Sequence, residues 1–175
     1  MRIFAIALLF VLGAMSLAAG QPAVDSKLLP LLKRLFPSAT AFSGKSGEPP
    51  HFKAFVNGPG PGAQTLAGLA FWTTELEPLE RGYDGPIKML VGMDPKGVLT
   101  GIIVVEHHEP YGSFSIEPPA FAAQFRGKNI RDPFKVGVDV DAVSRASMTI
   151  TSATRAVRNS ARRVARQVLV PDGGR

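Results

Sequence analysis

The chain contains no cysteine among its 175 residues. A chain without thiols forms no disulfides, no thiolate metal sites and no iron–sulfur clusters. These three kinds of site are therefore excluded for this sequence. Export to an oxidising compartment is compatible with this composition but is not established by it.

The sequence also lacks the short motifs of several common enzyme classes. It has no glycine-rich phosphate loop, no G-x-S-x-G nucleophile turn and no His-Glu-x-x-His zinc helix. Of its three histidines, His107 and His108 lie between Glu106 and Glu109. Neighbouring residues on a strand point to opposite faces, so this pair is poorly arranged to bind one metal ion. We expect no metal site, and instead a loop at a sheet end that contacts a ligand or partner.

The first residues have the pattern of a secretory signal peptide. Arg2 precedes an apolar run over residues 3–12, and small residues follow up to Gly20. The run is shorter than the roughly 20 apolar residues of a membrane span, which favours cleavage over an uncleaved anchor. We therefore predict a signal peptide over residues 1–20, followed by one domain over residues 21–175 with its core at about 65–169.

The first half of the predicted domain shows one helix and two strands. Leucines at helical spacing predict a short helix over residues 28–35, capped by Asp25 or Ser26. Residues 52–56 and 65–74 are apolar runs bounded by loops rich in glycine, proline and polar residues, which is typical of strands.

A hairpin is the clearest element. Residues 87–93 and 99–106 are strand-like runs joined by Asp-Pro-Lys-Gly at 94–97, which fits a type I turn closed by a left-handed glycine. Residues 102–105 are apolar on both faces, so we predict a central strand of the sheet.

The last third predicts short elements and then a long helix. A short helix is expected over residues 118–124, closed by Gly127, followed by strands at 134–140 and 147–151 and a helix over 152–169. These elements predict one α+β domain. A central, mostly antiparallel sheet with a hairpin is packed by the C-terminal helix and the short N-terminal helix.

One face of the predicted C-terminal helix is rich in arginine. Such a face is usually solvated, and the alternative is contact with anionic phospholipid or an acidic partner. Nucleic acid is not expected as a partner, because no aromatic stacking platform accompanies the arginines. The face comprises Arg155, Arg158, Arg162, Arg163 and Arg166.

The most informative segment is a row of hydroxyl side chains over residues 141–154 that leads into this helix. Hydroxyl groups and the free N–H groups of a helix N-terminus together suit a phosphate. The row contains Asp, two variable residues, Ser, a residue, Ala and Ser, from Asp141 to Ser147. An ordinary serine- and threonine-rich helix cap remains the alternative.

This motif resembles the flavinylation motif of the FMN-binding domain family, found in RnfG, NqrC and the periplasmic part of NosR/NirI-type proteins. Segments upstream resemble the same family in the same order. They are Gly82-Tyr83-Asp84-Gly85-Pro86-Ile87, Val91-Gly92-Met93-Asp94, Gly97-Val98-Leu99-Thr100-Gly101 and Glu106-His107-His108-Glu109-Pro110.

The resemblance implies a role for each residue of the motif. A flavin transferase would link the FMN phosphate to the Ser147 hydroxyl, beside the small Ala146. Asp141 and Ser144 would shape the turn through hydrogen bonds from their side chains to the backbone. Further hydroxyls would donate to phosphate oxygens, and these belong to Thr149, Thr151 and Ser152.

Aromatic or planar side chains are candidates to flank the flavin ring. Tyr83, His107 and Tyr111 are such candidates, while Phe114 is more typical of core packing. Two positions depart from the family pattern: the acceptor is Ser147 instead of the commoner Thr, and Arg145 replaces a Gly.

The resemblance implies a periplasmic flavoprotein that carries electrons through covalently bound FMN and is served by membrane-bound redox partners. An electron carrier is favoured over an enzyme, because no catalytic acid, base or substrate pocket is identified. The alternatives are a non-flavinylated binding or regulatory module, associated with membrane redox or nitrous oxide respiration, and a small flavin reductase.

Overall fold

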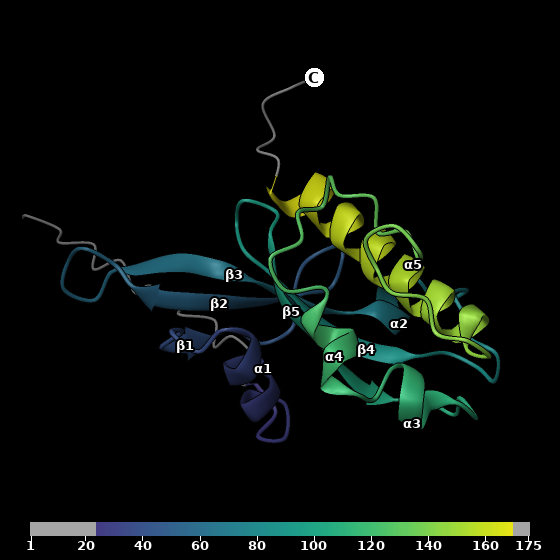
Figure 1. Cartoon of the computed structure of the whole chain (residues 1–175). Coiled ribbons are helices and arrows are strands. Elements are labelled where there is room, and N and C mark those ends of the chain that lie inside the picture. The colour runs from purple at the N-terminus through teal and green to yellow at the C-terminus, as the bar shows by residue number, and fades with distance from the viewer. Residues whose placement is uncertain (1–23, 170–175) are drawn as a thin grey trace, which may run out of the picture.

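The protein is described by a computed structural model over residues 24–169, which fold around a five-stranded antiparallel sheet with helices on both faces (Figure 1). The strands, side by side in chain order, are β1 (Ala41–Phe42), β2 (Phe52–Asn57), β3 (Gln64–Trp72), β4 (Lys88–Met93) and β5 (Leu99–Glu106). The helices are α1 (Leu29–Leu35), α2 (Thr73–Leu76), α3 (Gly112–Ser115), α4 (Pro119–Ala123), α5 (Ser147–Val164) and a π-helical end, η1 (Ala165–Leu169). The predicted α+β class is confirmed. The predicted signal peptide, residues 1–20, lies outside the described residues.

The β4–β5 hairpin forms where the sequence predicts it. Gly97 has φ +78°, and its N–H donates to the Asp94 carbonyl at 3.1 Å. The Asp94 carboxylate also accepts hydrogen bonds from the N–H groups of Lys96 and Val98, at 2.8 and 2.9 Å. Both the glycine and the aspartate of the turn are therefore required by its geometry.

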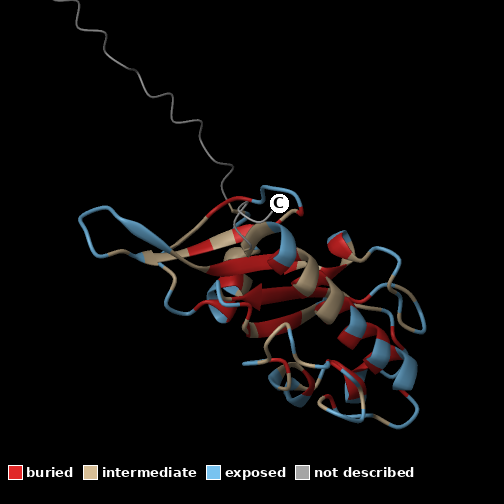
Figure 2. Cartoon of the chain, turned by 90° about the horizontal axis from the view of Figure 1, so that it is seen from above, coloured by how far each residue is buried: buried red, intermediate tan, exposed pale blue. Residues whose placement is uncertain are grey.

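Alternation along the strands divides the core into two layers, one on each side of the sheet. On β4, Met89 and Val91 pack toward α5, whereas Leu90 packs toward α1. On β5, Ile102 and Ile103 divide in the same way. Figure 2 shows the strands as mostly buried between exposed loops and helix faces. The larger layer, under α5, is the one that positions the segment around Ser147.

Helix α1 covers the opposite face of the sheet through Leu32, Leu35 and Phe36. The ring of Phe36 lies against Gly68, where an added Cβ would come within 2.4 Å of it. The sheet therefore has a glycine where the ring approaches most closely. The N-cap residue of α1 is Leu28, which provides no side-chain hydrogen bond, but the Asp25 carboxylate accepts a hydrogen bond from the Lys27 N–H at 2.8 Å in the turn just before the helix.

The position of β5 in the sheet differs from the prediction. Residues 102–105 were predicted to form a central strand, but β5 is the last strand in the order and lies at an edge. Its side chains are nevertheless buried on both faces over Ile102 and Ile103, because α1 and α4 each contact it. The apolar pattern of residues 102–105 therefore reflects helices covering both faces of β5, and it does not require a neighbouring strand on each side.

Two further predicted strands are absent from the described residues. Residues 134–140 form turns held by one isolated bridge between Val136 and Val140. Residues 147–151 belong to α5, which begins five residues earlier than predicted, at Ser147. Thr149 and Ile150 are buried in its first turn, and burial against the sheet outweighs the β-propensity of this short run. The short helix α4 is confirmed, and Gly127 after it has φ +81°.

The arginines of α5 are mostly used inside the fold. Arg162 donates to the carbonyls of Ile130 and Asp132, both at 2.8 Å, and Arg163 donates to the carbonyl of Leu76 at 2.9 Å. These bonds attach two loops to the helix, so the face is not simply solvated. Over residues 24–169, the structure contains no helix with the length and apolar character that crossing a membrane requires.

Candidate functional site

The motif identified in the sequence lies at the N-terminus of α5. Ser147 is the first residue of this 18-residue helix and is exposed. The N-cap residue is Ala146, whose side chain cannot accept a hydrogen bond, and no side-chain cap is present in the described part of the chain. The first N–H groups of a helix need partners from outside it. The helix therefore presents free donors and its positive dipole end beside the Ser147 hydroxyl.

The backbone makes a tight turn just before the helix. The N–H of Ala146 donates to the carbonyl of Val143 at 3.1 Å, and Arg145 has φ +68°. This left-handed conformation is the one that glycine adopts without strain, which explains the glycine of the family pattern at this position. Asp141 and Ser144 were expected to shape the turn through their side chains. Neither side chain makes a hydrogen bond within residues 24–169, so this expectation is not met.

A buried carboxylate joins three segments beneath the turn. Glu109 is 6% exposed and accepts hydrogen bonds from the N–H groups of Tyr83 and Asp84, both at 3.0 Å. Its Oε2 also accepts a hydrogen bond from the Thr149 hydroxyl. The carboxylate lies over Gly82, where an added Cβ would be 2.2 Å from Oε1. Glu109 thereby positions the first turn of α5 against the loop that carries Tyr83.

The hydroxyl groups after Ser147 have different surroundings. Thr149 and Ser152 are each 2% exposed, and Ser152 donates to Glu80 Oε1 at 2.9 Å. Arg155 also binds Glu80, with its Nη2 at 2.6 Å from Oε1. Both hydroxyls are thus engaged by carboxylates within the protein, while Ser147 and Thr151 face solvent. Neither carboxylate was predicted as a partner from the sequence, although Glu109 lies in one of the segments that carry the resemblance.

Exposed aromatic and apolar side chains gather near the same helix end. Tyr83 is 71% exposed, and its backbone shares the Glu109 carboxylate with Thr149. Tyr111 and Phe114 lie with ring centroids 5.4 Å apart on the segment around α3, which packs against α5. Phe114 is 47% exposed, so the prediction that it packs in the core is wrong. Met148, in the first turn of α5, is also exposed.

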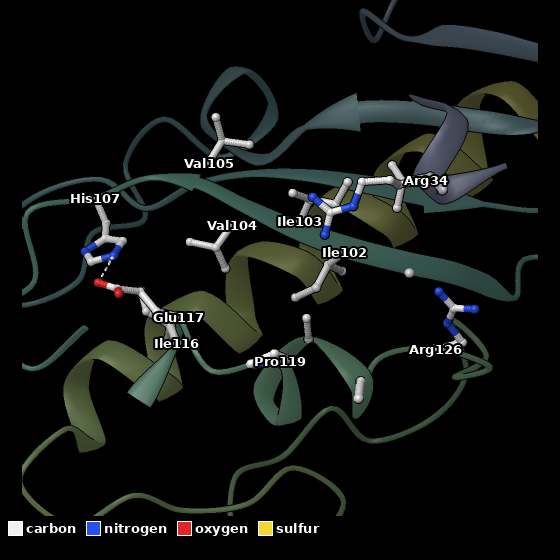
Figure 3. A pocket seen from close by; sticks show the side chains of 14 residues that line it. Arg34, Ile102, Ile103, Val104, Val105, His107, Ile116, Glu117, Pro119 and Arg126 are labelled. Carbon is white, nitrogen blue, oxygen red and sulfur yellow. Dashed lines mark ion pairs between the residues drawn. The ribbon is translucent and has the colours of Figure 1, made fainter. Parts of the chain in front are cut away.

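His107 holds its own loop instead of facing the helix end. Its Nδ1 accepts a hydrogen bond from the Glu109 N–H at 3.1 Å, and its Nε2 lies 3.1 Å from Glu117 Oε1 (Figure 3). With Nδ1 as acceptor, the proton resides on Nε2 and is directed to Glu117. Both ring nitrogens are therefore engaged within the protein. Over residues 24–169, no group of three or more acidic or histidine side chains is placed to bind a metal ion.

The loop that leads into the motif is fixed by Asp139. Its carboxylate accepts hydrogen bonds from the N–H groups of Lys135 and Phe134, at 2.6 and 3.1 Å, and from Lys128 Nζ at 2.9 Å. Burial raises the pKa of Asp139, but these hydrogen bonds and the Lys128 charge outweigh it and leave the pKa below its ordinary value. The ionised carboxylate thus stabilises the loop.

The sequence motif and this geometry agree with one family model. Residues 82–162 match the FMN-binding domain, a range that begins at the Gly82–Glu109 contact and includes most of α5. This part of the chain, just under half of its length, is therefore similar to the FMN-binding domain family.

Two similar proteins carry names that bear on this match. One is the G component of the ion-translocating oxidoreductase complex of Haemophilus influenzae, to which the chain is 58% identical over 47 residues, covering 27% of this chain and 21% of that protein. The other is the regulatory protein NosR of Pseudomonas aeruginosa, to which it is 33% identical over 114 residues, covering 59% of this chain and 16% of that protein. The chain thus matches only about a fifth or less of the length of each relative.

Proposed function

We propose that this protein is an exported electron carrier whose FMN is attached to Ser147 through a phosphoester. The observation that carries the proposal is the exposed Ser147 at an uncapped helix N-terminus, in the position of the family's flavinylation motif. In the net change Ser147 Oγ forms a bond to the phosphorus of the flavin donor, one phosphorus–oxygen bond of that donor breaks, and its leaving group departs with the hydroxyl proton, so the protein gains one FMN less one water. A flavin transferase would be the maturation partner.

The residues around Ser147 fit the singly charged phosphodiester that would join its hydroxyl to the flavin. The first N–H groups of α5 would donate to its oxygens, because Ala146 leaves them without a side-chain partner. Thr151 is exposed one helical turn further on. Thr149 and Ser152 would act indirectly, because their hydroxyls donate to Glu109 and Glu80.

The flavin ring would lie among the exposed side chains at this end of the molecule. Tyr83, Tyr111 and Phe114 provide aromatic faces, and Met148 provides an apolar contact. His107 is a weaker candidate, since both its nitrogens are engaged. When bound, FMN supplies one- and two-electron redox chemistry, while the protein sets its surroundings. The names of the relatives, a component of an oxidoreductase complex and NosR, support service to a membrane redox system.

Export is proposed from the signal-peptide pattern of residues 1–20. A contact between the arginines of α5 and an anionic membrane has less support. Arg155, Arg162 and Arg163 are bound to Glu80 and to loop carbonyls, which leaves Arg158 and Arg166 as the cations of this face with fewer constraints.

The test is to co-express the protein with a bacterial flavin transferase and to look for flavin fluorescence on a denaturing gel. Covalent flavin survives denaturation, whereas non-covalently bound flavin is released. We expect a fluorescent band for the wild type and for Ser38→Ala, which changes an exposed hydroxyl outside the motif, and none for Ser147→Ala. A fluorescent Ser147→Ala band would refute Ser147 as the acceptor. A wild-type protein that binds FMN only before denaturation would support the non-covalent binding module instead.

A further inference from the structure

A second feature lies away from Ser147, along the free edge of β5. The sheet ends at this strand, and its pairing on the outer side is limited to Leu99, which exchanges hydrogen bonds of 2.8 Å with Gly127 and Lys128. Beyond Leu99, the outer backbone groups of β5 have no backbone partner within residues 24–169. An edge strand with unpaired N–H and C=O groups is a template for another strand.

This edge forms the floor of a groove with a volume of about 660 Å³ (Figure 3). One wall is the end of α1, with Arg34 and Leu35, and the other is built from α4 and the residues just before it, with Ile116, Pro119 and Ala123. The floor runs from Gly101 to Val105. At a rise of about 3.3 Å per residue, this floor accommodates an extended segment of about five residues.

The two ends of the groove carry opposite charges. Arg126 lies at the end where β5 begins, and the side chain of Arg34 lies beside Ile103 (Figure 3). Both are exposed, and neither has a salt bridge or side-chain hydrogen bond within the part of the chain that the structure describes. The Nη2 of Arg126 is 4.0 Å from where a Cβ on Gly101 would lie. At the other end, Glu117 is half-exposed and pairs with His107.

We propose that this groove binds an extended segment of a partner protein as a sixth, antiparallel strand. Every pair in the sheet is antiparallel, and a strand antiparallel to β5 directs its C-terminal end toward the start of β5. The segment therefore carries acidic residues in its C-terminal half, facing Arg34 and Arg126, and a basic group at its N-terminal end, facing Glu117. Main-chain hydrogen bonds supply affinity, while apolar side chains contact the walls.

The probe is a fluorescein-labelled nonapeptide of alternating valine and threonine that begins with lysine and ends with aspartate and glutamate. Binding to the full-length mature protein is followed by fluorescence anisotropy. We expect saturable binding. A peptide with the charged ends exchanged should bind about tenfold more weakly, which corresponds to about 1.4 kcal/mol. A peptide N-methylated at alternate residues should lose binding, because it lacks the N–H groups that a strand needs.

Matched variants locate the site. Arg126→Glu and Arg34→Glu should each weaken binding of the acidic-ended peptide roughly three- to tenfold, whereas Arg131→Glu, an exposed arginine outside the groove, should not. Ala123→Glu places a charge in the groove wall and should weaken binding, and Ala120→Glu on the same helix should not. Circular dichroism and thermal unfolding confirm that each variant is folded. Residues 101–106 should gain protection from amide hydrogen exchange when the peptide binds.

Three results would overturn the proposal. One is the absence of saturable binding up to millimolar peptide, and another is equal affinity for the N-methylated peptide. The third is a wild-type dimer in sedimentation that Ala123→Glu dissociates and Ala120→Glu does not. That result would assign the groove to a second copy of this chain.

Discussion

At the scale of single residues, the candidate site depends on contacts that leave Ser147 free. Glu109 accepts a hydrogen bond from the Thr149 hydroxyl, and Glu80 accepts one from the Ser152 hydroxyl. The N-cap residue Ala146 provides no side-chain hydrogen bond to the helix. The hydroxyls of Thr149 and Ser152 are therefore already bonded inside the protein. The first N–H groups of α5 and the Ser147 hydroxyl remain available to a ligand. A serine, threonine or aspartate at position 146 would instead bond those N–H groups itself.

We predict that Glu109→Gln destabilises the fold by about 2 kcal/mol, because an amide accepts fewer hydrogen bonds than the carboxylate and leaves a buried donor unpaired. Thr149→Val should cost about 1 kcal/mol. Urea unfolding of both single variants and the double variant gives their coupling energy. We expect at least about 0.5 kcal/mol, and additive effects would show that the two side chains do not act together.

Arg145 tests the geometry of the turn. Because its φ is +68°, Arg145→Gly should relieve strain and leave stability unchanged or raised by up to about 1 kcal/mol. Arg145→Val should destabilise the protein by about 1–2 kcal/mol, since a β-branched side chain tolerates this conformation poorly. Thermal unfolding ranks the three proteins. A valine variant as stable as the glycine variant would contradict the assigned backbone conformation.

At the scale of elements, periodicity predicted the hairpin and the helices well but did not predict how they assemble. The turn at Asp94–Gly97 has local requirements that the sequence displays directly. The run Ser147–Thr151 is ambiguous, because its β-branched residues suit a strand and its apolar spacing also continues the helix that follows. Burial of Thr149 and Ile150 against the sheet decided between them. Likewise, the pattern of β5 indicates two covered faces, which helices provide as well as strands do.

The loop over residues 129–140 gives a prediction that depends on pH. The pKa of Asp139 is lowered, so its ionised form stabilises the fold. This contribution is fully present above the ordinary value of 3.8 and is lost as the pH falls below it through the lowered pKa. Asp139→Asn should therefore cost about 1–2 kcal/mol at neutral pH and much less at about pH 3.

Urea unfolding at the two pH values measures this difference. Asp84→Asn is the control, because that side chain is exposed and makes no hydrogen bond over residues 24–169, and it should change stability by less than about 0.5 kcal/mol. An Asp139→Asn cost that is equal at both pH values would show that the carboxylate charge is not responsible.

At the scale of the whole molecule, two distinct surfaces have different proposed roles, attachment of FMN and binding of an extended segment. The end of the sheet near α3 and the start of α5 holds Ser147 and exposed aromatic side chains, while the groove along β5 ends in the His107–Glu117 pair. The motif and its order along the chain were visible in the sequence. The groove was not, because it is built from α1, β5 and α4, which are distant in the chain and meet only in the folded protein.

The intact mass of the mature protein tests covalent attachment of FMN most directly. The protein is isolated from the periplasm of cells that co-express a flavin transferase. We predict a gain of roughly 440 Da, one FMN less one water, in the wild type and no gain in Ser147→Ala. An unmodified wild-type mass in the presence of an active transferase would contradict covalent attachment at Ser147.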